Sequence, residues 1–175
     1  MTPLLVRLGA PVLLFVYGTL RLIDGRDGHH DKDGALWNVG HVCFFIAFVL
    51  LAALTVHAYR TLHRHRAVAL PAVAAALFGA GCFLWVIVGD IFASFPELPD
   101  ALQVVGPALF QLGMLALLVL LVLARRAPWW SPALVVAAFA AIGVSLDLIP
   151  LAAVLLFAGL LPLGRPAAAM PASAA

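Results

Sequence analysis

The sequence predicts an all-α protein, a polytopic bundle of transmembrane helices. Of its 175 residues, 65% are hydrophobic and only 10% are charged, whereas soluble domains carry roughly a quarter charged residues. The mean hydropathy is +1.13, and the apolar residues form runs near the length of about 20 residues that a membrane span needs. No soluble fold can bury that much apolar surface. Any function must therefore lie in the bundle or its loops.

Polar segments divide the chain into six predicted spans. Each boundary falls where charged residues, glycine or proline interrupt an apolar run. We expect the six spans to form one transmembrane domain over residues 1–165, followed by a tail, 166–175, whose small residues and prolines favour disorder. The expected spans cover residues 3–23, 36–58, 67–89, 101–124, 132–146 and 148–163.

Residues 131–163 allow two interpretations. One straight helix of that length would measure ~50 Å, well beyond the hydrocarbon thickness of about 30 Å. We expect a tight turn near Asp147, because Ser131 followed by a proline, and Asp147 shortly before Pro150, are both typical of helix starts. The alternative is a single kinked helix, which would give five spans in total.

The distribution of charge predicts the orientation. With six spans and a cytoplasmic N-terminus, seven of the ten basic residues lie inside, whereas five spans would give six against four. The seven are Arg7, Arg60, Arg64, Arg66, Arg125, Arg126 and Arg165, and the three outside are Arg21, Arg26 and Lys32. One lysine beside nine arginines, with abundant Ala, Val and Leu, is typical of a GC-rich bacterial genome. We therefore expect a bacterial inner-membrane protein with both termini in the cytoplasm.

Five polar residues fall at similar depth in the outer half of the predicted bundle: Asn38, His41, Asp90, Gln103 and Asp147. Polar groups at membrane depth are unfavourable unless they face the bundle interior or a watery cavity, so they are candidates for function. They predict an outward-facing pocket for a small polar or cationic ligand. The alternative is that each residue caps a helix or links two helices by a hydrogen bond that contributes about 0.5–2 kcal/mol.

Metal and cofactor sites are not expected. The acidic loop at residues 24–34 contains part of a calcium-binding pattern, but His29 replaces the first carboxylate and Gly40 replaces the closing glutamate. His41 and His57 are sixteen residues apart on one predicted helix, ~24 Å along its axis, so they cannot bind one haem iron. The sequence also has no catalytic motif of hydrolases or nucleotide enzymes. Nucleic acid is not an expected partner.

Cys43 and Cys82 fall inside two consecutive predicted spans, ~10–12 Å below the outer boundary. Cysteine often serves as a small apolar core residue. We therefore expect two unpaired thiols on facing or neighbouring helices.

Three hypotheses for function follow from these features. The first is an accessory or interaction subunit whose bundle contacts membrane lipids and packs against itself or a membrane protein partner. The second is a transporter or binding protein that uses the outward pocket. The third is an intramembrane lipid-modifying enzyme with His41 and Asp90 as acid–base partners, which requires a substrate within hydrogen-bond reach. A water-accessible cavity would favour the second or third hypothesis, and dry packing would favour the first.

Overall fold

The computed structural model describes residues 4–27, 34–92 and 94–164, and this part of the chain is helical with no β-strand. The α-helices are α1 (Leu4–Asp24), α2 (Ala35–Thr61), α3 (Arg66–Ile91), α4 (Asp100–Leu123), α5 (Trp130–Val144) and α6 (Ile149–Leu160). Short 3₁₀ turns extend or connect them, namely η1 (Gly25–Asp27), η2 (His63–His65), η3 (Leu146–Leu148) and η4 (Leu161–Gly164). The predicted all-α bundle is confirmed.

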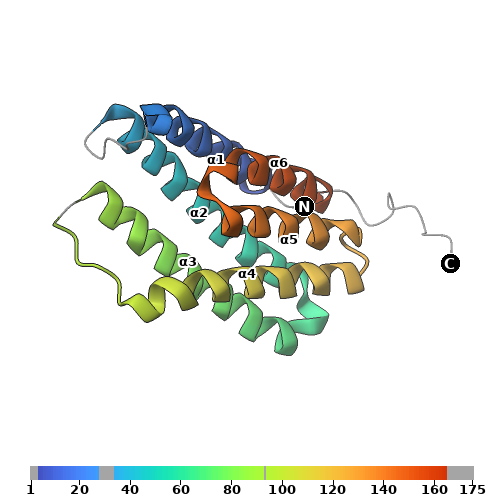
Figure 1. The fold of residues 1–175 in the computed structure, drawn as a ribbon. Coiled ribbons are helices and arrows are strands. Elements are labelled where there is room, and N and C mark those ends of the chain that lie inside the picture. Colours follow the sequence, from blue (N-terminus) through green and yellow to red (C-terminus); the bar gives the residue numbers. More distant parts are fainter. Residues whose placement is uncertain (1–3, 28–33, 93, 165–175) are drawn as a thin grey trace.

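The six helices form a ring in which each helix packs against its neighbours in sequence, and α6 packs against α1. Figure 1 shows this arrangement, with α6 between α1 and α5 and with α3 beside α4. Helix α2 also contacts α4 across the ring. Short connections between antiparallel neighbours are the usual topology of helix bundles.

Five helical segments are long and apolar enough to cross a membrane: Leu4–Asp24, Ala35–Thr61, His63–Ile91, Asp100–Leu123 and Leu146–Leu163. Helix α5 is equally apolar but has only 15 residues, and a helix of that length measures ~22 Å. The chain therefore has the architecture of a multi-pass membrane protein, and α5 is the shortest of these six segments, well below the hydrocarbon thickness of about 30 Å.

The chain reverses direction between α5 and α6, as the turn predicted near Asp147 requires. Ser145 has an extended backbone conformation (φ −158°, ψ 137°), and its side chain accepts a 3.2 Å hydrogen bond from the Asp147 N–H. Pro150 lies in the first turn of α6, where its missing N–H leaves no hydrogen bond unmade. Ser131 Oγ, near the start of α5, donates a 2.5 Å hydrogen bond to the Gly159 carbonyl, near the end of α6. The two helices are therefore antiparallel neighbours rather than one kinked helix.

Ser131 and Asp147, which were expected to cap α5 and α6, do not cap these helices. Helix α5 begins at Trp130 after the N-cap residue Trp129, so Ser131 lies inside its first turn, and the Ser131 hydroxyl bonds across to α6. Asp147 does not cap α6 either, since the residue before that helix is Leu148. The hydroxyl of Ser145 instead caps the turn η3.

Close backbone packing joins α3 to α4. A Cβ added at Gly79 would lie 2.3 Å from the Gly106 carbonyl oxygen, and one added at Gly113 would lie 2.4 Å from the Ala72 carbonyl oxygen. Both distances are shorter than any non-bonded carbon–oxygen contact. Small residues at these crossings let two membrane helices approach more closely than larger side chains would allow.

The centre of the bundle is aromatic. Phe110 is fully buried, and its ring centroid lies 5.3 Å from that of Phe48, 5.8 Å from Phe83 and 5.9 Å from Phe139. These distances are typical of favourable ring–ring contacts. The four rings come from α2, α3, α4 and α5 and join those helices at the middle of the bundle.

Candidate functional site

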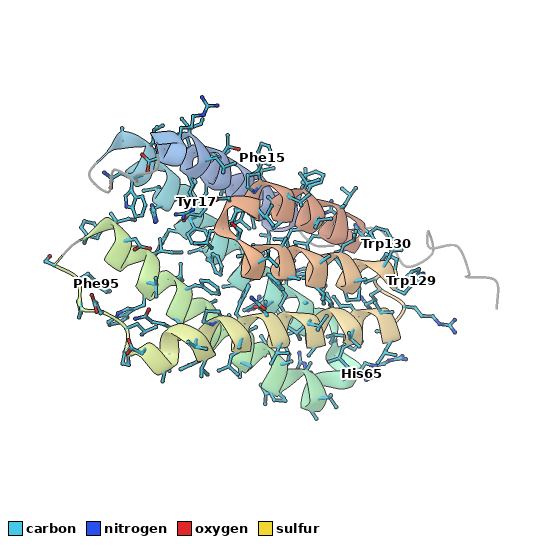
Figure 2. The ribbon with its side chains drawn as sticks, in the orientation of Figure 1. Phe15, Tyr17, His65, Phe95, Trp129 and Trp130 are labelled. Carbon is cyan, nitrogen blue, oxygen red and sulfur yellow. The ribbon has the colours of Figure 1, made fainter. Side chains whose placement is uncertain are left out.

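The two ends of the bundle differ in charge. At the polar end, α1, α3 and α5 finish and α2, α4 and α6 begin, and this end includes Asp24, Asp90, Asp100 and Asp147. The opposite, basic end includes Arg60, Arg64, Arg66, Arg125 and Arg126. In Figure 2, Phe95 lies at the polar end, whereas His65, Trp129 and Trp130 lie at the basic end.

His41 is the most deeply buried ionisable group of the candidate site, with 2% of its surface exposed. Its Nδ1 lies 2.8 Å from the Trp37 carbonyl oxygen, and because a carbonyl only accepts, Nδ1 carries the hydrogen. Its Nε2 lies 3.7 Å from Asp90 Oδ2. Two of the five residues that the sequence places at similar depth, His41 and Asp90, therefore lie close together. When Nε2 also carries a proton, the His41 ring is a cation and attracts the Asp90 carboxylate.

Trp37 joins α2 to α3 at the same place. Its indole N–H donates a 2.9 Å hydrogen bond to the Asp90 carbonyl oxygen, and its ring centroid lies 4.1 Å from that of His41. The carbonyl is available because α3 ends at Ile91, and the last carbonyls of a helix have no partner within the helix. An indole at the end of a membrane span usually marks only the depth of the boundary. The sequence did not predict that Trp37 joins His41 and Asp90 in a polar cluster.

Helix α1 completes the cluster with residues that the sequence did not indicate. Tyr17 packs edge-on against His41 with centroids 5.3 Å apart and stacks on Phe44 at 4.3 Å. Arg21 Nε lies 4.0 Å from Asp147 Oδ1, so α1 also reaches the turn before α6. The only signal for such residues in the sequence is their depth in the predicted bundle. Arg21 lies near the outer end of the first predicted span, at a depth similar to that of the five candidate residues, so depth alone could have included it.

The cavity beside His41 is very small. Its volume is about 10 Å³, roughly enough for one water molecule. Its polar lining comes from two helices, with Arg21 and Asp24 on α1 and His41 on α2. The rest of the wall consists of Tyr17, Leu36, Trp37 and Gly40. The polar end is therefore closely packed around these side chains.

The other three predicted site residues lie apart from the contact between His41 and Asp90. Gln103 is exposed, and its amide donates a 2.8 Å hydrogen bond to the Leu98 carbonyl in the segment before its own helix. The exposed Asp147 carboxylate lies beside Arg21. Asn38 is partly buried on α2, and within the described ranges no hydrogen bond joins its side chain to His41 or Asp90. A ligand-binding role for these residues stays a prediction.

Metal binding has no candidate in the part of the chain that the structure describes, because no group of three or more His, Cys, Asp or Glu residues there has suitable geometry. The loop with the partial calcium pattern includes residues 28–33, which lie outside the described residues. No protein-family model, no curated protein and no solved structure matches this chain. The function proposed below therefore depends on the chain's own geometry.

The two cysteines are unpaired, as predicted, and lie on the neighbouring helices α2 and α3. Cys82 is buried, and a Cβ added at Gly106 would lie 2.9 Å from its sulfur. The Cys82 side chain thus packs against α4. Cys43 is partly buried on α2.

Proposed function

We propose that this protein is an accessory or interaction subunit of a bacterial inner membrane, and that its bundle packs against itself or against another membrane protein. The observation that carries the proposal is the small cavity at the polar end, about 10 Å³ beside His41. A site with room for roughly one water molecule does not admit a polar metabolite. The polar cluster instead serves to connect helices.

The contacts of the cluster support a connecting role. Trp37 and His41 tie α2 to the end of α3 through Asp90, and Arg21 ties α1 to the turn before α6 through Asp147. Hydrogen bonds between membrane helices contribute about 0.5–2 kcal/mol each. The cluster thus fixes the polar ends of these helices relative to each other.

The short helix α5 supports the idea of a partner. Its ~22 Å length is less than the hydrocarbon thickness, and such a mismatch is relieved by thinning the bilayer or by association with another protein. Val144, the last residue of α5, is 80% exposed. A partner that packs beside α5 would cover this residue.

Site-specific photocrosslinking tests the proposal. We expect p-benzoylphenylalanine in place of Val144 to give crosslinked protein bands in native membranes, whereas the same group in place of Leu112, which is 63% exposed on α4, gives lipid adducts only. A band at twice the mass of the chain identifies self-association, and any other protein band identifies a different partner. Lipid adducts alone at both positions would contradict the proposal.

A transporter or ligand-binding function is the second candidate, and one observation favours it. His41 and Asp90 are ionisable groups 3.7 Å apart, and paired ionisable groups at membrane depth often mark ligand or proton pathways. On this alternative, His41→Ala and Asp90→Asn alter uptake of, or response to, a small polar or cationic ligand at unchanged membrane insertion. Wild-type behaviour of both variants, with crosslinking at position 144, supports the interaction subunit.

For the orientation, we propose that both termini lie in the cytoplasm. The split of seven basic residues against three supports this orientation. Alkaline phosphatase fused to the C-terminus is then inactive, and green fluorescent protein fused there is fluorescent. An active phosphatase fusion would place the C-terminus outside and contradict six spans.

A further inference from the structure

A second, larger cavity lies at the basic end. It has a volume of about 350 Å³, and its lining includes His63, Arg64 and His65 from the α2–α3 connection and Arg126 from the segment after α4. We call these four residues and their cavity the basic pocket. All four side chains are exposed. Two connections that are far apart in the sequence therefore present cationic or ionisable side chains to one space.

The end of α4 positions Arg126 for this pocket. Arg125 has a left-handed backbone conformation with φ 54°, and the Arg126 N–H donates a 2.8 Å hydrogen bond back to the Leu121 carbonyl oxygen. This pattern resembles the common helix ending in which a left-handed residue reverses the chain. The reversal places Arg126 at the wall of the basic pocket, together with Arg64.

The depth of the pocket corresponds to the headgroup layer of a bilayer. It lies where the long apolar helices α2 and α4 end. Trp129 and Trp130 are exposed at the same end, as Figure 2 shows, and exposed tryptophans concentrate where hydrocarbon meets headgroups. A lipid headgroup is therefore the molecule that this pocket meets in a membrane.

The basic pocket has no acidic counterpart among the described residues. Within the described ranges, every Asp and Glu belongs to the polar end or the connections there. The guanidinium groups of Arg64 and Arg126 thus have no carboxylate of the described chain beside them. Arginine binds phosphate oxygens through two parallel N–H donors.

We propose that the basic pocket binds the phosphate-bearing headgroup of an anionic phospholipid, with Arg64 and Arg126 contacting the phosphate and with His63 and His65 beside it. Basic pockets between transmembrane helices bind lipid headgroups of this kind. The cavity volume favours a whole headgroup over a small inorganic anion. This inference is independent of the proposed interaction function, because the pocket and position 144 lie at different ends of the bundle.

Native mass spectrometry of the full chain in detergent tests the proposal, with dioleoyl phosphatidylglycerol, dioleoyl phosphatidylcholine and inorganic phosphate as probes. We expect phosphatidylglycerol to bind at least about tenfold more tightly than the other two. The double variant Arg64→Gln/Arg126→Gln should lose about tenfold in affinity for phosphatidylglycerol. Arg64→Lys/Arg126→Lys keeps the charge and should retain part of the affinity.

The matched control is Arg66→Gln/Arg125→Gln. It removes the same charge from the same end of the bundle, but neither residue lines the basic pocket. We expect this control to bind phosphatidylglycerol as the wild type does. Equal losses in both double variants would show unspecific attraction and overturn the proposal, and so would equal binding of phosphatidylcholine or of inorganic phosphate. Circular dichroism spectra that match the wild type establish that each variant is folded.

Discussion

At the scale of single residues, Trp37 makes the contact on which the polar end depends. An indole N–H buried in a membrane protein needs an acceptor, and the Asp90 carbonyl provides it at 2.9 Å because α3 ends one residue later. The same side chain lies over the His41 ring. One residue of α2 thus fixes the end of α3.

Replacing Trp37 by phenylalanine tests this contact. The change removes the N–H donor and leaves the Asp90 carbonyl without its partner, so we expect the free energy of unfolding to fall by about 1–2 kcal/mol. The control is Trp85→Phe, since the Trp85 indole also donates to a backbone carbonyl, that of Pro96, but is exposed. Its loss should be below about 0.5 kcal/mol. Unfolding in detergent followed by circular dichroism compares the two, and equal losses would contradict a special role for Trp37.

A double-mutant cycle on His41 and Asp90 measures their interaction. The Asp90 side chain is 38% exposed, so water screens the pair and we expect a coupling free energy of about 0.5–1 kcal/mol. The variants are His41→Ala, Asp90→Ala and both together. The pair Arg21 and Asp147 is the comparison, because Asp147 is more exposed and its distance to Arg21 is longer, and its coupling should be smaller. Strictly additive effects at His41 and Asp90 would show that their 3.7 Å separation has no energetic consequence.

The sequence predicted part of this site for a physical reason. Helical rise places residues of consecutive spans at known depths, so the approach of His41 to Asp90 was predictable. Depth does not determine the rotation of a helix about its axis. Gln103 and Asp147 were therefore expected at a shared pocket, whereas their side chains contact the Leu98 carbonyl and Arg21. Trp37 was missed because an indole at a membrane boundary usually marks depth alone.

At the scale of elements, the crossing of α3 and α4 depends on glycine. We expect Gly79→Ala to reduce the free energy of unfolding by about 1–3 kcal/mol, because the new Cβ would overlap the backbone of α4 and the helices would have to separate. Gly81→Ala on the same helix is the control, since nothing lies within 4 Å of a Cβ there. It should be neutral or stabilising by up to about 1 kcal/mol. Thermal unfolding in detergent compares the stability of the two variants. A Gly79→Ala variant as stable as the wild type would contradict the close crossing of α3 and α4.

The reversal between α5 and α6 was predictable, but its details were not. A proline in the first turn of a helix and a polar residue before it are local signals, and they indicated a break near Asp147. Which hydroxyl makes which hydrogen bond depends on the packing of two helices. Ser131 therefore bonds to Gly159 of α6 instead of capping its own helix.

At the scale of the whole molecule, the two ends of the bundle have separate roles in the proposals made here. The polar end is closely packed and connects helices, the basic pocket faces the headgroup layer, and α5 presents an exposed end to a partner. The side of the membrane on which α6 and the C-terminus lie depends on the reversal at Ser145, because a single long helix would move both across the bilayer. The number of spans is thus the central claim of this topology.

Cysteine labelling in intact cells tests the number of spans most directly. In a background with Cys43→Ala and Cys82→Ala, a single cysteine replaces either Leu146, which is exposed in η3 at the polar end, or Arg126, which is exposed at the basic end. We expect a membrane-impermeant maleimide to label Leu146→Cys in intact cells and Arg126→Cys only after the membrane is permeabilised. If Leu146→Cys is not labelled in intact cells, the turn does not reach the outer surface, and the six-span topology is wrong.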